Sequence, residues 1–200
     1  MNSRIIIIGG GFGGIEAAFS LKGLIGSAVD ITLIDRSPYH SFLPSIHEII
    51  SGKTTARDLQ IPLATLLSPA RIAFLNEEVL SIDTDRRSVV ISSDTRAYDY
   101  LVMATGAQNT FYGIPGAEAH AYRFRSPEDA ERIRSALDAL LEDYGRTVRI
   151  VLAGGGTEGI EVAGEIVDAI TAHGRDNDFA EEWNKLPRNL RYLRTRRAFQ

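Results

Sequence analysis

The feature that most limits how this chain can fold is a glycine-rich phrase that occurs twice. Residues 4–18 read RIIIIGGGFGGIEAA, and the phrase returns as RIVLAGGGTEGIEVA at residues 149–163, at a constant offset of 145 residues. Each copy has an apolar, β-branched run, then a glycine turn, then apolar residues at helical spacing, which predicts a buried strand followed by a helix. We therefore predict an α/β fold built on a parallel sheet with right-handed crossovers.

The first glycine turn has the spacing that a dinucleotide needs. Gly9 would permit the tight turn, Gly11 would let a pyrophosphate approach the backbone, and Gly14 would let the helix pack close to the sheet. A second buried strand, VDITLID, ends in Asp35, where a carboxylate can accept hydrogen bonds from a ribose. A turn used only for packing would explain Gly14 but not three glycines and the acid, so we predict a dinucleotide site.

The second glycine turn repeats this spacing with Gly154, Gly156 and Gly159. A strand is predicted before it at Arg149–Ala153, and a helix after it at Ile160–Ala172. No acid clearly ends a following strand, so the second site is less well supported by its surroundings.

Between the two copies the pattern predicts further strands and two helices. The strands are Ile72–Leu75 continuing into Val79–Asp83, then Val89–Ser92 and Tyr98–Ala104, and the close spacing of the later ones indicates an antiparallel meander. The segment LQIPLATLL, residues 59–67, predicts a short helix interrupted by Pro62.

Residues 126–145 predict an amphipathic helix with a well-defined start. Ser126 is the expected N-cap, Pro127 lies in the first turn, and Asp129 stands where a capping box places an acid. Gly145 is the expected stop. The apolar stripe of this helix consists of Ala130, Ile133, Leu137, Leu140 and Leu141.

The composition excludes several classes of protein. The chain has no cysteine, which removes disulfide scaffolds, thiolate metal sites and cysteine nucleophiles. A net charge of −4 does not favour a nucleic-acid partner, and no apolar stretch approaches the ~20 residues of a transmembrane helix. We expect a cytoplasmic chain without a metal site. His40 and His47 are predicted to be hydrogen-bonded structural residues, and Glu77–Glu78 a solvated turn.

Three motifs in this order resemble the two-dinucleotide-binding flavoproteins of the pyridine nucleotide–disulfide oxidoreductase superfamily. The N-terminal phrase with ITLID resembles the FAD unit, YDYLVMATGA at residues 98–107 resembles the second flavin motif, and residues 148–166 resemble the NAD(P)H unit. The segment YHSFLPSIHEIISGK, residues 39–53, resembles the Phe-x-Pro segment near the flavin of type II NADH dehydrogenases and sulfide:quinone reductases. Because the chain lacks redox cysteines, it is most similar to the type II NADH:quinone dehydrogenases.

The resemblance implies an FAD site and an NAD(P)H site. The residues implied for FAD are Gly9, Gly11 and Gly14 at the pyrophosphate, Asp35 with Arg36 at the adenosine ribose, Pro44 near the flavin ring, Val79 at adenine, and Thr105 and Gly106 beside the flavin. Those implied for NAD(P)H are Gly154, Gly156 and Gly159 at the pyrophosphate and Glu161 at the nicotinamide end. Since hydride passes directly from nicotinamide to flavin, the resemblance implies no catalytic acid or base.

The same resemblance implies how the chain is divided. Residues 1–112 would form the N-terminal segment of the FAD domain, 113–145 a linker and connecting helix, and 146–200 an incomplete NAD(P)H unit. The segment LRYLRT, residues 190–195, could be the missing strand and would set Arg194, Arg196 and Arg197 where NADPH carries a 2′-phosphate. We favour the alternative that residues 181–200 are a truncated, frameshifted or divergent tail.

Two functions remain open at this stage. The first is an FAD-dependent oxidoreductase that passes hydride from NAD(P)H to flavin and electrons to a quinone-like acceptor. It would be an N-terminal portion of the family's usual chain, acting as a homo-oligomer or with a complementing chain, and peripheral to the membrane in the full-length family. The second is a noncatalytic nucleotide-binding remnant, or an interaction partner of a complete homologue.

Overall fold

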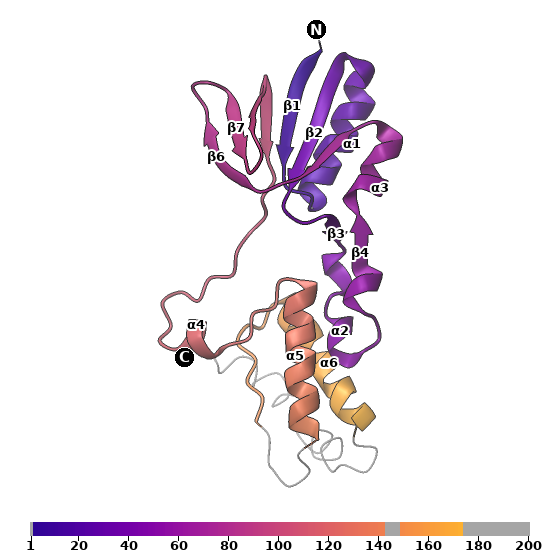
Figure 1. Cartoon of the computed structure of the whole chain (residues 1–200). Helices are drawn as coiled ribbons and strands as arrows, with labels where there is room; N and C mark the ends of the chain where they lie inside the picture. The colour runs from indigo at the N-terminus through magenta and orange to yellow at the C-terminus, as the bar shows by residue number, and fades with distance from the viewer. Residues whose placement is uncertain (1, 143–148, 174–200) are drawn as a thin grey trace. The chain divides into compact units, whose positions relative to one another are not determined.

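The computed structural model describes residues 2–142 and 149–173 of the 200-residue chain (Figure 1). It divides into two compact units, each made of two stretches of sequence. Unit 1 consists of Met1–Phe42 and Gln60–Thr110, and unit 2 consists of Leu43–Leu59 and Phe111–Gln200. The predicted boundaries at 112 and 145 divide the chain differently, because residues 43–59 pack with the later helices.

Unit 1 contains the predicted parallel sheet. Its four strands are β1 (Ser3–Ile8), β2 (Val29–Asp35), β5 (Ala73–Asn76) and β9 (Tyr100–Met103), in the order β5-β2-β1-β9. All three pairings are parallel, and β1 lies between β2 and β9. Helix α1 (Phe12–Ile25) connects β1 to β2. The α/β, Rossmann-like architecture predicted from the sequence is confirmed.

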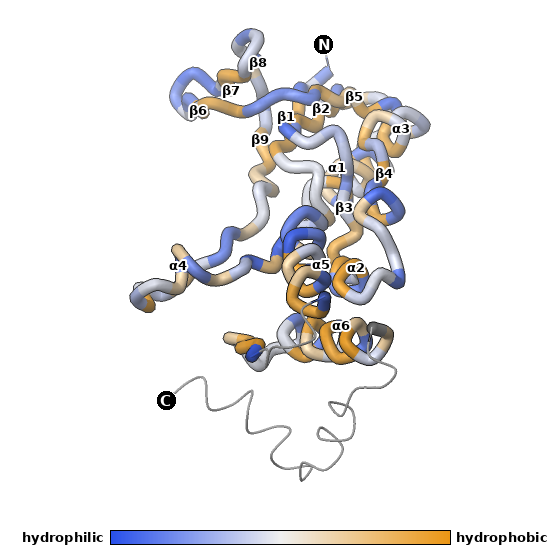
Figure 2. Tube along the Cα trace, turned by 60° about the horizontal axis from the view of Figure 1, so that its bottom comes forward, coloured by the Kyte–Doolittle hydropathy of each residue, from blue (hydrophilic) through white to orange (hydrophobic). Residues whose placement is uncertain are grey.

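The apolar runs of β1 and β2 form the centre of unit 1, and the tube along both strands is mostly apolar (Figure 2). Ile7 and Leu33 are fully buried. One face of the sheet packs on α1 and on α3 (Leu63–Leu67). The core residues on this face are Ile5, Ile7, Ala18, Val29, Ile31, Leu33, Leu63, Leu67 and Ile72.

The second face of the sheet is covered by a three-stranded antiparallel meander. Its strands are β6 (Val79–Asp83), β7 (Ser88–Ile91) and β8 (Thr95–Ala97). The prediction that Ile72–Leu75 continues into Val79–Asp83 as one strand is wrong, because β5 belongs to the parallel sheet and β6 to the meander. The chain leaves the sheet at Glu77, whose N–H donates to the carbonyl of Asp35 at 3.1 Å.

A short hairpin-like pair precedes α3. Strand β3 (Tyr39–Ser41) pairs antiparallel with β4 (Gln60–Pro62). Sequence reasoning extended a helix over residues 59–67, but the helix begins only at Leu63. Proline disfavours helical backbone in the residue before it, so Pro62 ends a strand and sets the start of the helix. Two 3-10 turns complete this unit, η1 (Gly26–Ala28) and η4 (Ser68–Ala70).

Within the described residues, unit 2 is built from helices. They are η2 (Leu43–Ser45), α2 (Glu48–Ser51), η3 (Ala56–Leu59), α4 (Ala117–His120), α5 (Pro127–Leu141) and α6 (Thr157–His173). Its core joins α2, η3, α5 and α6 through Ile46, Ile49, Ile50, Ala56, Leu59, Ala130, Leu137, Val162, Ile166 and Ala169.

Helix α5 begins as its sequence predicts. The Ser126 hydroxyl accepts from the Asp129 N–H at 3.2 Å, and the Asp129 carboxylate reaches back to the N–H of Arg125 at 3.0 Å. Of the predicted stripe, Ala130 and Leu137 are buried in the core of unit 2. Leu140 is 41% exposed and lies outside that core. The predicted stop at Gly145 lies outside the described residues.

The predicted strand at Arg149–Ala153 is wrong for the described structure. This segment has no strand conformation, and Val151 is 82% exposed. A strand is stabilised by hydrogen bonds to a neighbouring strand, and among the described residues unit 2 contains none to pair with it. The predicted helix that follows is confirmed as α6. In the part of the chain that the structure describes, no helix combines the length and apolar character needed to cross a membrane.

Candidate dinucleotide site

The first glycine turn joins β1 to α1 and is closely surrounded. Gly9 has φ +111°, which favours glycine, and its N–H donates to the carbonyl of Ile34 at 2.9 Å. A Cβ atom at Gly9 would overlap the carbonyl oxygen of Ala104, at the end of β9. A Cβ atom at Gly14 would overlap the carbonyl oxygen of Gly9. The sheet and the helix can therefore approach this closely only because these two positions lack side chains.

Gly11 differs from the other two glycines because it borders open space. Apart from Gly11 itself and its two chain neighbours, no heavy atom of the described residues lies within 4 Å of a Cβ built at Gly11. Gly11 is the N-cap of α1, has extended backbone, and supplies no side-chain cap, and the first turn of α1 carries no acid. The first N–H groups of a helix lack intrahelical acceptors and lie at its positive end, so this arrangement fits an anion such as a pyrophosphate.

Asp35, the predicted ribose ligand, lies at the end of β2 and faces the turn. Its Oδ2 accepts from the N–H of Gly10 at 2.5 Å, and its Oδ1 accepts from the N–H of Ser37 at 2.7 Å. A carboxylate has about four lone-pair positions, so acceptor capacity remains for a ribose hydroxyl. Asp35 therefore holds the glycine turn, a contact that the sequence did not reveal.

His40 is the other residue that holds the turn. Its Nδ1 donates to the carbonyl of Gly10 at 3.0 Å, and the side chain is buried. The prediction that His40 is a hydrogen-bonded structural residue is confirmed in that respect. Its partner could not be predicted, because nothing in the local sequence joins residue 40 to residue 10.

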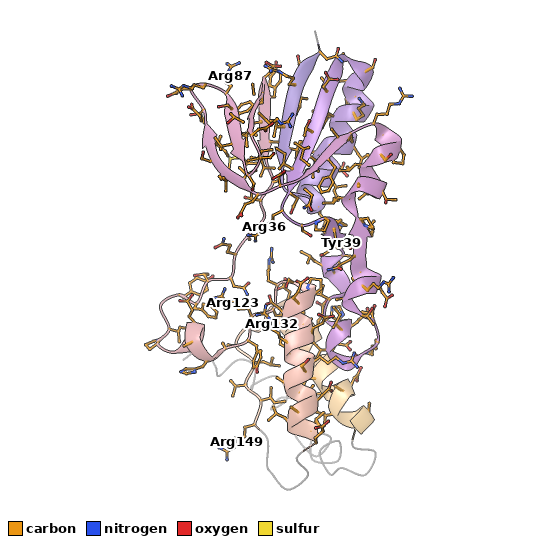
Figure 3. The ribbon with its side chains drawn as sticks, in the orientation of Figure 1. Arg36, Tyr39, Arg87, Arg123, Arg132 and Arg149 are labelled. Carbon is orange, nitrogen blue, oxygen red and sulfur yellow. The ribbon has the colours of Figure 1, made fainter. Side chains whose placement is uncertain are left out.

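The remaining residues predicted for FAD in unit 1 lie at the carboxyl ends of strands or on the meander. Arg36 follows β2 and is exposed (Figure 3), and its carbonyl accepts from the Asn76 side chain at 2.9 Å. Val79 is the first residue of β6. Thr105 and Gly106 follow β9 and are exposed, and Thr105 N would lie 3.2 Å from a Cβ at Gly9.

The second glycine turn, in unit 2, has the same backbone features as the first. Gly154 has φ +123°, and a Cβ at Gly159 would overlap the carbonyl oxygen of Gly154. The N–H of Ile160 donates to Gly156 at 3.1 Å, as that of Ile15 donates to Gly11 at 3.0 Å. In the described part of the chain, however, no heavy atom lies within 4 Å of a Cβ built at Gly154 or Gly156.

Helix α6 contacts residues 47–53, which include α2, through three acidic side chains, Glu161, Glu165 and Asp168. Glu161 lies 3.7 Å from Nδ1 of His47, measured from its Oε2. Glu165 is buried and accepts from the hydroxyl of Ser51. These contacts place Glu161, the residue predicted at the nicotinamide end, beside a histidine of the segment predicted to approach the flavin.

Lys53 forms ion pairs with two of these acids, and the contacts of His47, Ser51 and Lys53 with α6 form a row of polar contacts. Its Nζ lies 2.6 Å from Oδ2 of Asp168 and 2.9 Å from Oε1 of Glu165. The hydrogen bonds to Asp168 and then to Glu165 raise the pKa of Lys53 above its ordinary value. The row therefore fixes α6 against α2 by charge as well as by the apolar core.

The predicted site residues are thus divided between the two units. Unit 1 brings together Gly9, Gly11, Gly14, Asp35 and Thr105. Unit 2 holds the second turn with Glu161, and also Pro44, which lies exposed in η2.

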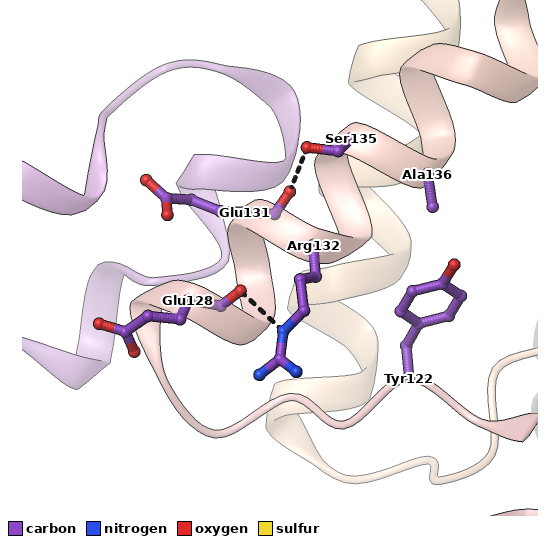
Figure 4. Close-up of a pocket in the computed structure, with 6 residues that line it drawn as sticks. All are labelled: Tyr122, Glu128, Glu131, Arg132, Ser135 and Ala136. Carbon is purple, nitrogen blue, oxygen red and sulfur yellow. Dashed lines mark hydrogen bonds between the residues drawn. The ribbon is translucent and has the colours of Figure 1, made fainter. Parts of the chain in front are cut away.

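An open pocket on the surface of unit 2 contains no predicted site residue (Figure 4). In it, Arg132 Nε donates to the carbonyl of Glu128 at 3.3 Å and the Ser135 hydroxyl donates to that of Glu131 at 2.9 Å, so these groups bind their own helix. Its lining consists of Tyr122, Glu128, Glu131, Arg132, Ser135 and Ala136. Across the described ranges 2–142 and 149–173, no group of three or more His, Asp or Glu side chains could hold a metal.

The fold and the glycine turns define an α/β protein of the dinucleotide-binding class. Residues 3–176 match the family model described as pyridine nucleotide-disulphide oxidoreductase. The chain therefore belongs to the pyridine nucleotide-disulphide oxidoreductase family, as its motifs predicted. FAD and NAD(P)H are the cofactors expected of a member of this family.

Curated relatives include quinone reductases of several kinds. The chain is 31% identical over 180 residues to a demethylphylloquinone reductase of Synechocystis, covering 86% of this chain and 45% of the relative. It is 27% identical over 175 residues to the type II NADH:quinone oxidoreductase of Staphylococcus haemolyticus, covering 84% and 44%. A sulfide-quinone reductase of Aquifex aeolicus is 36% identical over 149 residues, with 74% and 34% covered. The chain thus spans less than half the length of these relatives.

Solved structures agree with this assignment. The sulfide:quinone oxidoreductase of Aquifex aeolicus matches with a TM-score of 0.66 at 36% identity, over 71% of this chain and 33% of that chain. The NADH:rubredoxin oxidoreductase of Clostridium acetobutylicum matches with 0.66 at 27% identity, over 84% and 43%. NDH2 of Plasmodium falciparum in complex with NADH matches with 0.75 over 88% and 40%, and at 23% identity it supports the fold.

Proposed function

We propose that this protein is an FAD-dependent oxidoreductase that takes hydride from NAD(P)H and passes electrons to a quinone-type acceptor. The observation that carries the proposal is the first glycine turn, where the N-terminus of α1 borders open space at Gly11 while Asp35 holds the neighbouring peptide. A turn serving packing alone would need Gly9 and Gly14, but would not need an uncapped, acid-free helix start beside open space.

The residues of unit 1 fit FAD. Gly11 and the first N–H groups of α1 would bind the pyrophosphate, and the free acceptor positions of Asp35 would bind the adenosine ribose. Thr105 and Gly106 follow the strand that borders Gly9, so their backbone would lie beside the same ligand. When bound, FAD would supply the hydride-accepting chemistry, and the chain's own residues would bind and orient it.

The second glycine turn supports an NAD(P)H site. Its positive φ at Gly154 and the close approach of Gly159 repeat the geometry of the first turn. Gly156 would face the pyrophosphate of NAD(P)H, and Glu161, one turn further along α6, would lie toward the nicotinamide end. Residues 1–112 and 146–200 would accordingly carry the two cofactors.

A quinone-type acceptor is supported by the names of the relatives, which include demethylphylloquinone, NADH:quinone and sulfide-quinone reductases. Disulfide substrates are not supported, since the chain has no cysteine to exchange with them. We further propose that the protein acts as a homo-oligomer or with a complementing chain, and that it acts at the membrane surface.

The colour of the purified protein tests this proposal. The 200-residue chain is titrated with FAD, then NADH is added without oxygen, and a soluble quinone last. We expect weak flavin binding, bleaching of the flavin absorbance on NADH, and its return with the quinone. Failure to bind FAD at saturating concentration would contradict the proposal for this chain.

A second candidate function is a noncatalytic nucleotide-binding remnant, or a partner of a complete homologue. It is favoured by the segment 149–153, which precedes the second glycine turn and has no strand conformation in the described structure. This candidate predicts that the chain binds FAD or an adenine nucleotide, but that NADH leaves the flavin oxidised. The same titration therefore separates the two functions.

A further inference from the structure

The peptide groups on both sides of Gly10 are held by separate side chains. The N–H of Gly10 donates to Asp35, and its carbonyl accepts from His40. The residue is buried, and a Cβ at this position would meet Cδ1 of Leu63 at 2.5 Å. Gly10 is therefore fixed by two hydrogen bonds and by packing. In the Gly-x-Gly-x-x-Gly pattern it stands at the first x, where the pattern does not require glycine.

The contacts of His40 determine where its proton lies. A carbonyl oxygen can only accept, so Nδ1 of His40 must carry the hydrogen in its bond to Gly10. The imidazole ring also meets the ring of Phe12 edge-on, with centroids 4.7 Å apart and planes at 80°. Phe12 is the first residue of α1, so His40 contacts the turn and the start of the helix.

The hydrogen bond to the Gly10 carbonyl also directs the next N–H group. In a trans peptide the C=O and the following N–H point in opposite directions, and the described chain has no cis peptide bond. Because the Gly10 carbonyl points to His40, the N–H of Gly11 points away from His40. Gly11 is the glycine that borders open space at the start of α1.

We propose that His40 is a positioning residue of the dinucleotide site, which sets the Gly11 N–H in advance toward the pyrophosphate of the ligand. The role rests on the proposed function, in which FAD is that ligand. An N–H group that is already oriented loses little conformational entropy when the anion binds. Its orientation therefore increases the affinity of the protein for the ligand. Without the Nδ1 donor, the carbonyl of the Gly10–Gly11 peptide loses its hydrogen bond, and the direction of the Gly11 N–H is less firmly set.

Three substitutions of His40 separate the hydrogen bond from packing. His40→Asn places an amide N–H close to the position of Nδ1, His40→Gln places it near Nε2, and His40→Phe keeps the ring contact but removes the donor. We expect FAD affinity to fall about 3- to 10-fold in His40→Phe and His40→Gln and to remain within about 2-fold in His40→Asn. His120→Phe, at an exposed position on α4, is the matched control and should leave affinity unchanged.

Thermal unfolding of the same variants guards against a general loss of fold. If affinity follows unfolding temperature rather than the presence of a donor at the Nδ1 position, His40 is only a structural residue and the proposal is overturned. Equal FAD affinity in the wild type and in His40→Phe would overturn it as well.

A probe without flavin distinguishes this proposal from the proposed function. Inorganic pyrophosphate is titrated while the amide resonance of Gly11 is followed by NMR. We expect a shift in the wild type and in His40→Asn that is lost in His40→Phe. If the wild type binds no FAD but shows this pattern, the proposed function fails and the role of His40 stands. If the Gly11 response is the same in all variants, or is absent in the wild type, the role of His40 fails.

Discussion

The two glycine turns of this chain have nearly the same backbone but different surroundings. Gly9 and Gly154 both have positive φ, and Gly14 and Gly159 both lie against the carbonyl of the first glycine. The first turn is enclosed by the ends of β1, β2 and β9 and by Asp35 and His40. In the described part of unit 2, the second turn has no strand beside it, and α6 is held by α2 and α5. The comparison shows that a glycine phrase is enough to encode the turn, whereas the close packing around the first turn comes from the sheet.

The largest expected effect comes from adding one methyl group at the third glycine of each turn. Gly14→Ala places a Cβ against the Gly9 carbonyl, which the sheet prevents from moving, so we expect a loss of about 1–3 kcal/mol in unfolding free energy and loss of FAD binding. Gly159→Ala makes the same contact with Gly154, which has open space at its own Cβ position, so the substitution should cost less. Urea unfolding, with hydrogen exchange resolved for each unit, measures the loss of unfolding free energy in the two variants. Equal losses would contradict the expected difference between the two turns.

The next effect tests the acid that only the first turn has. Asp35→Ala leaves the N–H groups of Gly10 and Ser37 without their acceptor, so we expect about 1–3 kcal/mol of destabilisation together with weaker FAD binding. Asp30→Ala on the exposed side of β2 is the control and should change stability by less than about 0.5 kcal/mol. A stable Asp35→Ala protein with weak FAD binding would mean that the carboxylate acts on the ligand alone.

A third prediction concerns the polar contacts that hold α6 against α2 in unit 2. Glu165→Ala removes the buried acceptor of Ser51 and one partner of Lys53, so we expect about 1–3 kcal/mol of destabilisation confined to α2, α5 and α6. Hydrogen exchange in β1, β2 and α1 should be unchanged, because unit 1 keeps its contacts. Asp168→Asn, whose side chain is 55% exposed, serves as the control with a small effect. Hydrogen exchange that increases in β1 and β2 of Glu165→Ala would contradict this division.

The smallest effect concerns the ion pair that joins β1 to the start of β9. The hydrogen bonds from the side chain and the backbone N–H of Arg4 lower the pKa of Asp99 below its ordinary value of 3.8. A lowered folded-state pKa gives stabilisation that is present above 3.8 and is lost as pH falls through the folded value. The difference in unfolding temperature between the wild type and Asp99→Asn should therefore be constant at neutral pH and shrink as the pH falls below 3.8. A difference that does not change as the pH is lowered through this acidic range would mean that the charge of Asp99 is not its cause.

Sequence reasoning found the elements whose cause is local. The run Ile5–Ile8 predicts a strand buried on both faces, and Ser126 with Asp129 predicts the start of α5, because each signal is contained in a few adjacent residues. The separation of β5 from β6 could not be predicted, since it depends on the N–H of Glu77 meeting the carbonyl of Asp35. The strand expected at Arg149–Ala153 failed for a related reason, because an apolar run becomes a strand only beside another strand.

The candidate site shows the same limit. The glycine spacing and Asp35 were found from the sequence, and the family assignment that they suggested is confirmed. That Asp35 and His40 both hold Gly10 depends on the packing of β2, β3 and α1, so it became visible only in the structure. The cofactor-binding roles of all the predicted site residues stay predictions, and they include those of Asp35 and of the glycines in both turns.

The central claim is that Gly11 faces the pyrophosphate of FAD, and one substitution separates this claim from packing. Gly11→Asp adds a good N-cap residue in open space, so the fold should be unchanged or stabilised by a few tenths of a kcal/mol, whereas its negative charge repels a phosphate. Gly156→Asp in the second turn is the matched control.

The decisive measurement is a titration of FAD into the wild type and these two variants. The account predicts that Gly11→Asp weakens FAD binding by about tenfold or more, equivalent to at least about 1.4 kcal/mol, while Gly156→Asp binds FAD like the wild type. A Gly11→Asp protein that is folded and binds FAD with wild-type affinity would contradict it.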